Sequence, residues 1–92
     1  MTVVKPRILV IHGPNLNLLG RREPHIYGST TLEEINQKLL EQAELLRLDV
    51  ETLQTNHEGV MVEVIQKAMT GYNGVIINPA AFSHYSIAVR DA

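Results

Sequence analysis

The sequence predicts an α/β fold, a doubly wound parallel sheet, in a single domain that comprises residues 1–92. Two observations support this prediction. The segments Arg7–His12 and Gly74–Asn78 are continuous runs rich in β-branched residues, which is typical of strands buried on both faces of a parallel sheet. Between them, segments with helical periodicity alternate with another strand-like segment, Leu48–Leu53, and this order favours parallel strands joined by helical crossovers.

The first half of the chain provides two strands and one helix. Gly13 and Pro14 end the first strand, and the polar segment that continues to residue 30 is predicted to be a loop. A loop longer than about 12–15 residues in a small domain is usually a lid or a binding loop. Thr31 and Glu34 match a capping box, which predicts a helix from Leu32 to about Arg47, followed by a strand over Leu48–Leu53. The apolar face of that helix comprises Leu32, Ile35, Leu39, Ala43 and Leu46.

The second half repeats this order and ends inside a helical pattern. Asn56–Gly59 is predicted to be a turn. A second amphipathic helix, marked by Val62, Ile65 and Met69, ends at Gly71, and Pro79 ends the third strand. Residues 86–92 read as the opening turns of a third helix without a terminating Gly, Asn or Pro.

This ending predicts that the chain is the first part of a longer domain. A three-stranded parallel sheet leaves an edge strand open, so we expect the C-terminal strands of the domain to be missing from the 92 residues. The alternative is the frayed C-terminus of a complete small protein, which the length still permits.

Composition narrows the classes of partner. Eight Lys and Arg residues against ten Asp and Glu residues give a net charge of −2, which disfavours nucleic acid because phosphate binding needs a basic surface. The sequence has no cysteine, so it has no disulfide framework, no thiolate nucleophile and no cysteine-ligated zinc. The start lacks a signal-peptide pattern, and the run Ile8–Ile11 is far shorter than the roughly 20 residues that span a membrane. We therefore expect a cytoplasmic protein without membrane contact.

The polar residues after the first and third strands are the candidate site. In an open parallel sheet, ligands bind beyond the carboxyl ends of the strands, where the strand order reverses. If the order is 2-1-3, the loops after these two strands face each other across that crevice. The first loop carries Asn15, Asn17, Arg21, Arg22, Glu23 and Tyr27, and the second carries Asn78, Ser83, His84 and Ser86.

Three common kinds of site fit poorly. Gly13-Pro14-Asn15 matches neither glycine-rich phosphate-binding motif, and no lysine follows it. Ser83 and Ser86 lack the nucleophile-elbow motif and a clear partner acid. The four histidines lack metal-ligand spacing, and His57 with Glu58 favours capping or substrate positioning over a metal site. They are His12, His25, His57 and His84.

Arg22 and Tyr27 together could form a base. A guanidinium about 4 Å from a phenolate stabilises it by about 4 kcal/mol at an effective dielectric constant of about 20, but by only about 1 kcal/mol in bulk water. Only the drier case brings the phenol pKa from about 10 close to 7, so the loop would have to close before Tyr27 could act. From spacing alone, a solvated tyrosine beside a surface arginine remains the other interpretation.

Three ordered motifs resemble a known family. Residues 12–28 (HGPNLNLLGRREPHIYG) closely resemble the opening motif of type II 3-dehydroquinate dehydratases. Asn56–Gly59 is similar to the second block of that family, and residues 78–84 with Ala88–Asp91 are similar to the third. The resemblance extends over essentially the whole chain. It implies a flavodoxin-like fold and a lyase of the shikimate pathway, which leads to aromatic amino acids, with no cofactor and no metal.

The resemblance also implies roles for six residues. It assigns Tyr27 as the base that removes the C2 proton of 3-dehydroquinate, Arg22 as the group that lowers the pKa of this phenol, and Asn15 as the holder of a water that supports the enolate oxygen. Anti elimination through the enolate then gives 3-dehydroshikimate. Asn78 and His84 are expected to bind the substrate, as is Asp91 from a neighbouring subunit of a homododecamer.

The chain departs from the family pattern in two places and lacks one part of it. His12 stands where Asn is usual and Tyr85 where Thr is usual. The general-acid histidine of the family lies in a C-terminal part beyond these 92 residues. Because general acid catalysis is typically worth about 10²–10⁴ in rate, we expect the 92-residue chain alone to be inactive or badly impaired. The alternative function is a non-catalytic flavodoxin-like module that binds an anion or a nucleotide.

Overall fold

The computed structural model describes residues 4–21, 28–84 and 86–92 of the chain. Strands and longer helices alternate along these residues. In chain order the elements are β1 (Arg7–His12), η1 (Leu16–Leu18), α2 (Leu32–Leu46), β2 (Asp49–Gln54), α3 (Glu58–Lys67), β3 (Gly74–Asn78), η2 (Ala80–His84) and α4 (Ile87–Asp91).

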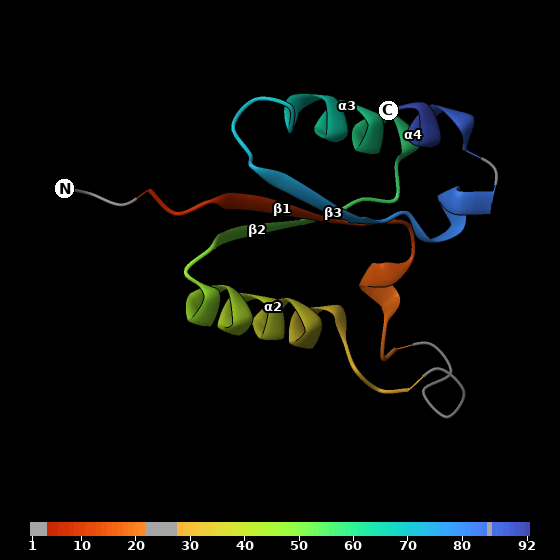
Figure 1. Cartoon of the computed structure of the whole chain (residues 1–92). Coiled ribbons are helices and arrows are strands. Elements are labelled where there is room, and N and C mark those ends of the chain that lie inside the picture. Colours follow the sequence, from red (N-terminus) through yellow and green to blue (C-terminus); the bar gives the residue numbers. More distant parts are fainter. Residues whose placement is uncertain (1–3, 22–27, 85) are drawn as a thin grey trace.

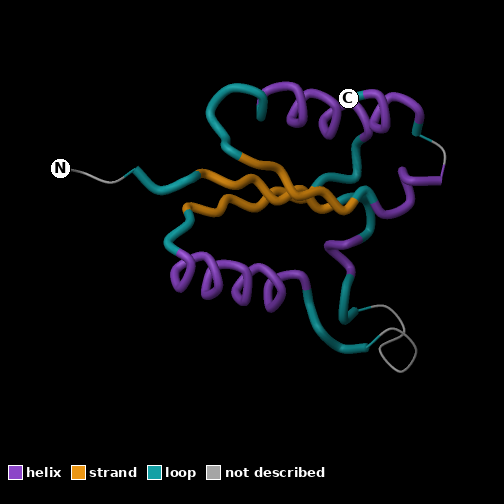
Figure 2. The backbone as a smooth tube through the Cα atoms, viewed as in Figure 1, coloured by secondary structure: helices purple, strands orange, loops and turns teal. Residues whose placement is uncertain are grey.

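The three strands form one parallel sheet in the order β2-β1-β3. Helix α2 lies on one face of the sheet, and α3 and α4 lie on the other (Figure 1). The predicted α/β class, parallel pairing and 2-1-3 order are confirmed. The register places His12 opposite both Gln54 and Asn78, so all three strands end at the same level. The chain that follows each strand leaves the sheet at this edge (Figure 2).

The core lies between the sheet and α3. Leu9 and Ile11 point to this face and pack with Met61, Ala68 and Phe82. Ile11 and Met61 have no exposed surface. Because successive side chains of a strand alternate between faces, Val10 is buried on the opposite face, toward α2.

The expected apolar face of α3 was wrong at Met69. The helix ends at Lys67, so Met69 lies beyond its last turn and is 84% exposed. Helix α3 also begins earlier than predicted, because Glu58 is helical rather than part of a turn. Met61, aligned with Ile65 and Ala68 by the period of the helix, lies on the face that packs on β1 and is the buried methionine of the core.

Helix α2 begins as predicted and loses its contact with the sheet before it ends. The Thr31 hydroxyl accepts a hydrogen bond from the Glu34 amide at 3.2 Å, which is one half of the capping box. Among the described residues, the Glu34 carboxylate forms no hydrogen bond back to the cap. Ala43 is buried, but Leu46 is 65% exposed because the last turn of the helix is left uncovered.

Strand β3 is less buried than its sequence predicts. Val75, Ile76 and Ile77 are all exposed, although the apolar run reads as a strand covered on both faces. Among the described residues, β3 pairs with β1 on one side only, and no strand lies along its other edge. Its side chains therefore receive less cover than those of the central strand.

Local boundaries differ slightly from the predicted ones elsewhere. The expected loop after β1 contains the short helix η1, and β2 lies one residue later than predicted. The third helix, α4, forms where the sequence indicates it, with the Ser86 hydroxyl accepting a hydrogen bond from the Val89 amide at 3.1 Å. No helix within the described ranges is long and apolar enough to cross a membrane.

Candidate functional site

The carboxyl ends of the three strands are joined by backbone hydrogen bonds just beyond the sheet. The Thr55 amide donates to the His12 carbonyl at 3.0 Å, which extends the β1–β2 pairing by one residue. On the other side, the Gly13 amide donates to the Asn78 carbonyl at 2.8 Å. The segments after β1, β2 and β3 are therefore fixed against one another, as expected for the edge where α/β proteins bind ligands.

Side-chain amides continue these contacts outward. The Gln54 Nε2 atom donates to the Gly13 carbonyl at 3.1 Å and to Asn56 Oδ1 at 3.0 Å. The same Asn56 oxygen accepts a hydrogen bond from the Asn15 amide at 2.9 Å. We call this set the carboxyl-end network, and its members are Gly13, Asn15, Gln54, Asn56 and Asn78.

Asn15 has an unusual backbone and an available side chain. Its dihedral angles, φ 67° and ψ −5°, lie in the left-handed region, which Asn tolerates better than most residues with a side chain. The residue is exposed, and its side chain forms no hydrogen bond with any described residue. As far as the described residues go, the Asn15 carboxamide can hold a water or a ligand.

Asn78 is held by the segment that follows it. Its side-chain Oδ1 accepts a hydrogen bond from the Ala80 amide at 3.1 Å, and Ala80 has a left-handed φ of 50°. The amide group of Asn78 has no such partner among the residues that the structure describes. Asn78 therefore presents a hydrogen-bond donor at the strand end, beside the Asn15 segment.

Of the remaining predicted site residues, two, Tyr27 and Arg22, lie outside the part of the chain that the structure describes. His84 belongs to η2, six residues after Asn78. Asp91 is exposed at the end of α4, and no hydrogen bond or ion pair connects it to the described residues of the carboxyl-end network.

Buried His12 joins this edge to α2. Its side chain is 7% exposed, and Nε2 donates to Asn36 Oδ1 at 2.9 Å. His57 is the residue before α3, and its side chain makes no capping hydrogen bond. Substrate positioning, the other role expected of His57 with Glu58, stays a prediction. His25 lies outside the described residues. Across the described part of the chain, no group of three or more His, Asp or Glu residues could hold a metal ion.

Sequence reasoning missed Gln54 and underestimated Asn56. Gln54 follows the predicted end of its strand, and Asn56 read only as part of a turn. The available signal was position, because polar amides at the carboxyl end of a parallel strand face the ligand-binding edge of the fold. Which atoms they contact depends on the left-handed turn at Asn15, and no spacing rule predicts that geometry.

The opposite, amino-terminal edge of the sheet carries a charged cluster. The Arg7 guanidinium contacts Glu51 Oε1 at 2.8 Å and Asp49 Oδ2 at 3.9 Å, and lies 4.6 Å from the centre of the Tyr72 ring. The Tyr72 hydroxyl donates a hydrogen bond to Glu51. We call these four residues the amino-end clamp. Hydrogen bonds from Tyr72 and then Arg7 lower the pKa of Glu51, and the bond to Glu51 raises the pKa of Tyr72.

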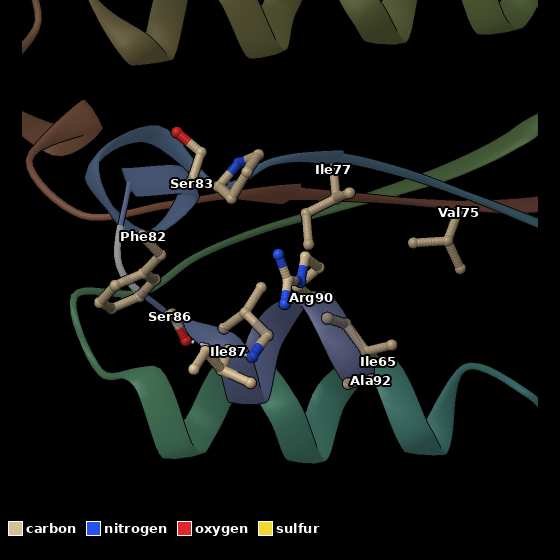
Figure 3. Close-up of a pocket in the computed structure, with 11 residues that line it drawn as sticks. Ile65, Val75, Ile77, Phe82, Ser83, Ser86, Ile87, Arg90 and Ala92 are labelled. Atoms are coloured by element: carbon tan, nitrogen blue, oxygen red, sulfur yellow. Dashed lines mark hydrogen bonds between the residues drawn. The ribbon is translucent and has the colours of Figure 1, made fainter.

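An apolar cavity of about 740 Å³ is lined by none of the residues of the carboxyl-end network, although Ile77 and Pro79, on either side of Asn78, belong to its lining. Its walls come from β3, α3, the η2 segment and α4 (Figure 3). Ile65, Val75, Ile77 and Ile87 supply much of the lining, and Arg90 is the charged side chain among the lining residues. The Ser83 and Ser86 hydroxyls both have local backbone partners. This lining does not suit a ligand with many hydroxyl groups.

Comparison with known proteins points to one family. Residues 6–92 match the family described as dehydroquinase class II. A 3-dehydroquinate dehydratase of Acaryochloris marina is 60% identical over 88 residues, which cover 96% of this chain and 59% of that protein. A 3-dehydroquinate dehydratase of Nostoc is 58% identical over 85 residues, covering 92% of this chain and 58% of that protein.

Solved structures agree with the sequence match. The crystal structure of type II dehydroquinase from Butyrivibrio crossotus has a TM-score of 0.88 at 45% identity, covering 95% of this chain and 61% of that chain. The type II dehydroquinase from Propionibacterium acnes has a TM-score of 0.87 at 48% identity, covering 98% of this chain and 62% of that chain. This chain therefore spans about three fifths of the length of the relatives that it matches.

Proposed function

Because the chain belongs to the class II dehydroquinase family, we propose that it takes part in the dehydration of 3-dehydroquinate to 3-dehydroshikimate. The proposal is carried by the arrangement of two segments at the carboxyl ends of the strands. There the segments bearing Asn15 and Asn78 are joined by the 2.8 Å hydrogen bond from the Gly13 amide to the Asn78 carbonyl. Two expected site residues from separate motifs thus lie on adjoining segments, where this fold binds ligands.

The proposed reaction is an anti elimination through an enolate. Tyr27 takes the C2 proton as general base, and Arg22 stabilises its phenolate. Negative charge then develops on the carbonyl oxygen of the substrate. Asn15 holds a water that donates a hydrogen bond to this oxygen, and preorganised donors of this kind lower the barrier where charge develops. The hydroxyl group leaves as water once it has received a proton from a general acid.

Substrate binding is proposed for three further residues. The amide group of Asn78, which has no partner among the described residues, donates to a substrate hydroxyl, while its Oδ1 stays bonded to the Ala80 amide. His84 and, from a neighbouring subunit, Asp91 complete the polar contacts to hydroxyl and carboxylate groups. These assignments rest on the resemblance of the motifs that contain the three residues.

The proposal includes a dodecameric assembly and a cytoplasmic location. The assembly rests on the family resemblance, and it would supply Asp91 from a second subunit. The location is supported by the absence of cysteine from the 92 residues, which suits a reducing compartment. Light scattering of the purified protein and fractionation of cells test the two statements separately.

The activity is best tested in a protein that includes a general acid. We expect the 92-residue chain alone to be impaired by about 10²–10⁴ for want of that group. A chimera joining residues 1–92 to the remaining segment of the Acaryochloris marina relative supplies it. The enone product absorbs in the ultraviolet, so turnover of 3-dehydroquinate can be followed directly. Robust turnover by the 92-residue chain itself would overturn the argument for a missing acid.

Tyr27→Phe in this chimera tests the proposed base. We expect the substitution to abolish turnover while the protein still binds 3-dehydroquinate, because only the phenolic oxygen is removed. Tyr72→Phe is the matched control, since Tyr72 belongs to the amino-end clamp at the other edge of the sheet. Equal activity of Tyr27→Phe and the parent chimera would contradict the proposal, and co-purification of a nucleotide or flavin would favour a binding module.

A further inference from the structure

The left-handed backbone of Asn15 is supported by another residue. A residue with a side chain adopts this conformation at a cost, unless its surroundings hold it. The Asn15 side chain makes no local hydrogen bond among the described residues, so it does not hold its own turn. Two contacts of its backbone do so: the Leu18 amide donates to the Asn15 carbonyl at 2.9 Å, and the Asn15 amide donates to Asn56 Oδ1 at 2.9 Å. The second is the one that a side chain provides.

Gln54 in turn fixes the orientation of Asn56. The Gln54 amide group provides two N–H donors, one for the Gly13 carbonyl and one for Asn56 Oδ1. Asn56 Oδ1 therefore accepts hydrogen bonds from both the Asn15 amide and Gln54 Nε2. If the Asn56 carboxamide were flipped, its NH₂ group would face these two donors instead. The orientation of Asn56 follows from its neighbours, and it presents an acceptor to Asn15.

The sheet does not need these side chains to stay paired. Strands β1 and β2 are in register up to His12 and Gln54, and the Thr55 amide still donates to the His12 carbonyl beyond them. Asn56 is exposed and belongs to no strand or helix. The Gln54–Asn56 contacts thus act on the segment that carries Asn15.

We propose that Gln54 and Asn56 are positioning residues, which hold Asn15 in its left-handed turn and so present its carboxamide at the strand ends. The functional consequence rests on the proposed role of Asn15 in binding the water beside the enolate. Neither residue has to touch the substrate for this role. The chemistry required of Asn56 is an acceptor oxygen, and the chemistry required of Gln54 is a pair of donors.

Gln54→Glu and Asn56→Asp, which both add one negative charge, separate the need for donors at position 54 from the need for an acceptor at position 56. Gln54→Glu keeps the shape but replaces both donors with an acceptor, which then opposes the Gly13 carbonyl and Asn56 Oδ1. Asn56→Asp keeps an acceptor oxygen for both donors. Asn56→Leu has a similar shape and no acceptor. The positioning role predicts damage from Gln54→Glu and Asn56→Leu, and rescue at position 56 by Asp.

The exchange rate of the Asn15 amide, measured in the ¹⁵N-labelled 92-residue chain, tests this prediction. We expect exchange at the Asn15 amide to accelerate by about tenfold in Gln54→Glu and Asn56→Leu, as for loss of one hydrogen bond. Asn56→Asp should remain close to the parent. Amides of the central strand report whether each variant is folded. Unchanged exchange at Asn15 in Gln54→Glu, or equal acceleration in Asn56→Leu and Asn56→Asp, would overturn the proposal.

Titration of the chimera described above, carrying the same substitutions, with 3-dehydroquinate separates the positioning of Asn15 from its effect on substrate binding. If positioning matters for function, Gln54→Glu and Asn56→Leu weaken binding and Asn56→Asp restores it. Failure of the parent chimera to bind 3-dehydroquinate would count against the proposed function of this chain, while the exchange rates still decide whether Gln54 and Asn56 hold Asn15. Normal binding by variants with fast exchange at Asn15 would contradict the functional consequence.

Discussion

The two edges of the same three strands are held together by different chemistry. At the carboxyl edge, neutral amides and backbone carbonyls connect the segments that follow β1, β2 and β3. At the amino edge, the amino-end clamp uses a guanidinium, two carboxylates and a phenol. Its ion pairs are about half exposed, with 42% of the Arg7 side chain and 47% of the Glu51 side chain accessible.

This difference suits two different tasks. Amide hydrogen bonds fix direction without adding net charge, so the carboxyl-end network can shape the backbone while charged groups remain available for an anionic substrate. Exposed ion pairs are screened by solvent and salt, so the clamp is expected to contribute little to stability. We therefore expect substitutions at the carboxyl edge to cost more than comparable substitutions at the amino edge.

Gly13→Ala should have the largest effect. A Cβ at residue 13 would lie 2.5 Å from the Pro79 carbonyl oxygen and 2.9 Å from that of Asn78, and neither is the end of a flexible side chain. The segments after β1 and β3 would have to separate, which we expect to destabilise the fold by about 1–3 kcal/mol or more. Chemical unfolding monitored by circular dichroism measures this loss.

Gly74→Ala is the matched substitution at the amino edge. There a new Cβ would approach only the end of the Ile8 side chain, at 3.1 Å, which can move. Gly in a strand interior is itself unfavourable by roughly 0.5–1 kcal/mol relative to Ala, so the net change should be small. Equal destabilisation by the two substitutions would remove the distinction between the edges.

His12→Ala should have an intermediate effect. The substitution removes a buried imidazole and leaves the half-buried Asn36 side chain without its 2.9 Å partner, which typically costs about 1–3 kcal/mol. The double variant with Asn36→Ala isolates the coupling between the two side chains. If the free-energy losses of the single variants simply add, the hydrogen bond is not what holds α2 to the end of β1.

The fold was predictable because its signals are local. The β-branched runs and the helical periodicity specify element type within short windows, and the crossover rules favour parallel strands, so the α/β class followed from local patterns. The 2-1-3 order was an assumption that suited the family resemblance, and the sheet confirms it. The predictions of burial failed where the burial of a side chain depends on segments far away in the sequence. Met69 continued a helical pattern beyond the true helix end, and Ile76 belongs to an apolar run that the described part of the chain leaves uncovered.

The candidate site was predictable in outline and not in detail. Topology alone places Asn15 and Asn78 at neighbouring strand ends, because parallel strands share a carboxyl edge. The support from Gln54 and Asn56 depends on a left-handed turn and on the orientation of two carboxamides, which no pattern of residue types determines. Roles for Tyr27 and Arg22 came from family resemblance, and they remain predictions.

Glu51→Gln should have the smallest effect, confined to one range of pH. The hydrogen bond from Tyr72, followed by that from Arg7, lowers the pKa of Glu51 below its usual value of about 4.3. A carboxyl group with a lowered folded-state pKa stabilises the protein above the unfolded-state pKa, and this contribution disappears as pH falls through the folded-state value. Unfolding by urea at a series of pH values should therefore show a shallower acid decline in Glu51→Gln than in the parent.

Salt and a second carboxylate sharpen this last comparison. Because the clamp is exposed, added salt should shrink the difference between Glu51→Gln and the parent at pH 7, whereas the effect of Gly13→Ala should hardly change. Glu63→Gln is the control, since Glu63 is exposed and has no ion pair or hydrogen bond from its side chain among the described residues. An identical acid decline in Glu51→Gln and Glu63→Gln would show that the clamp does not hold the amino edge, whose strands would then depend on backbone pairing and the core alone.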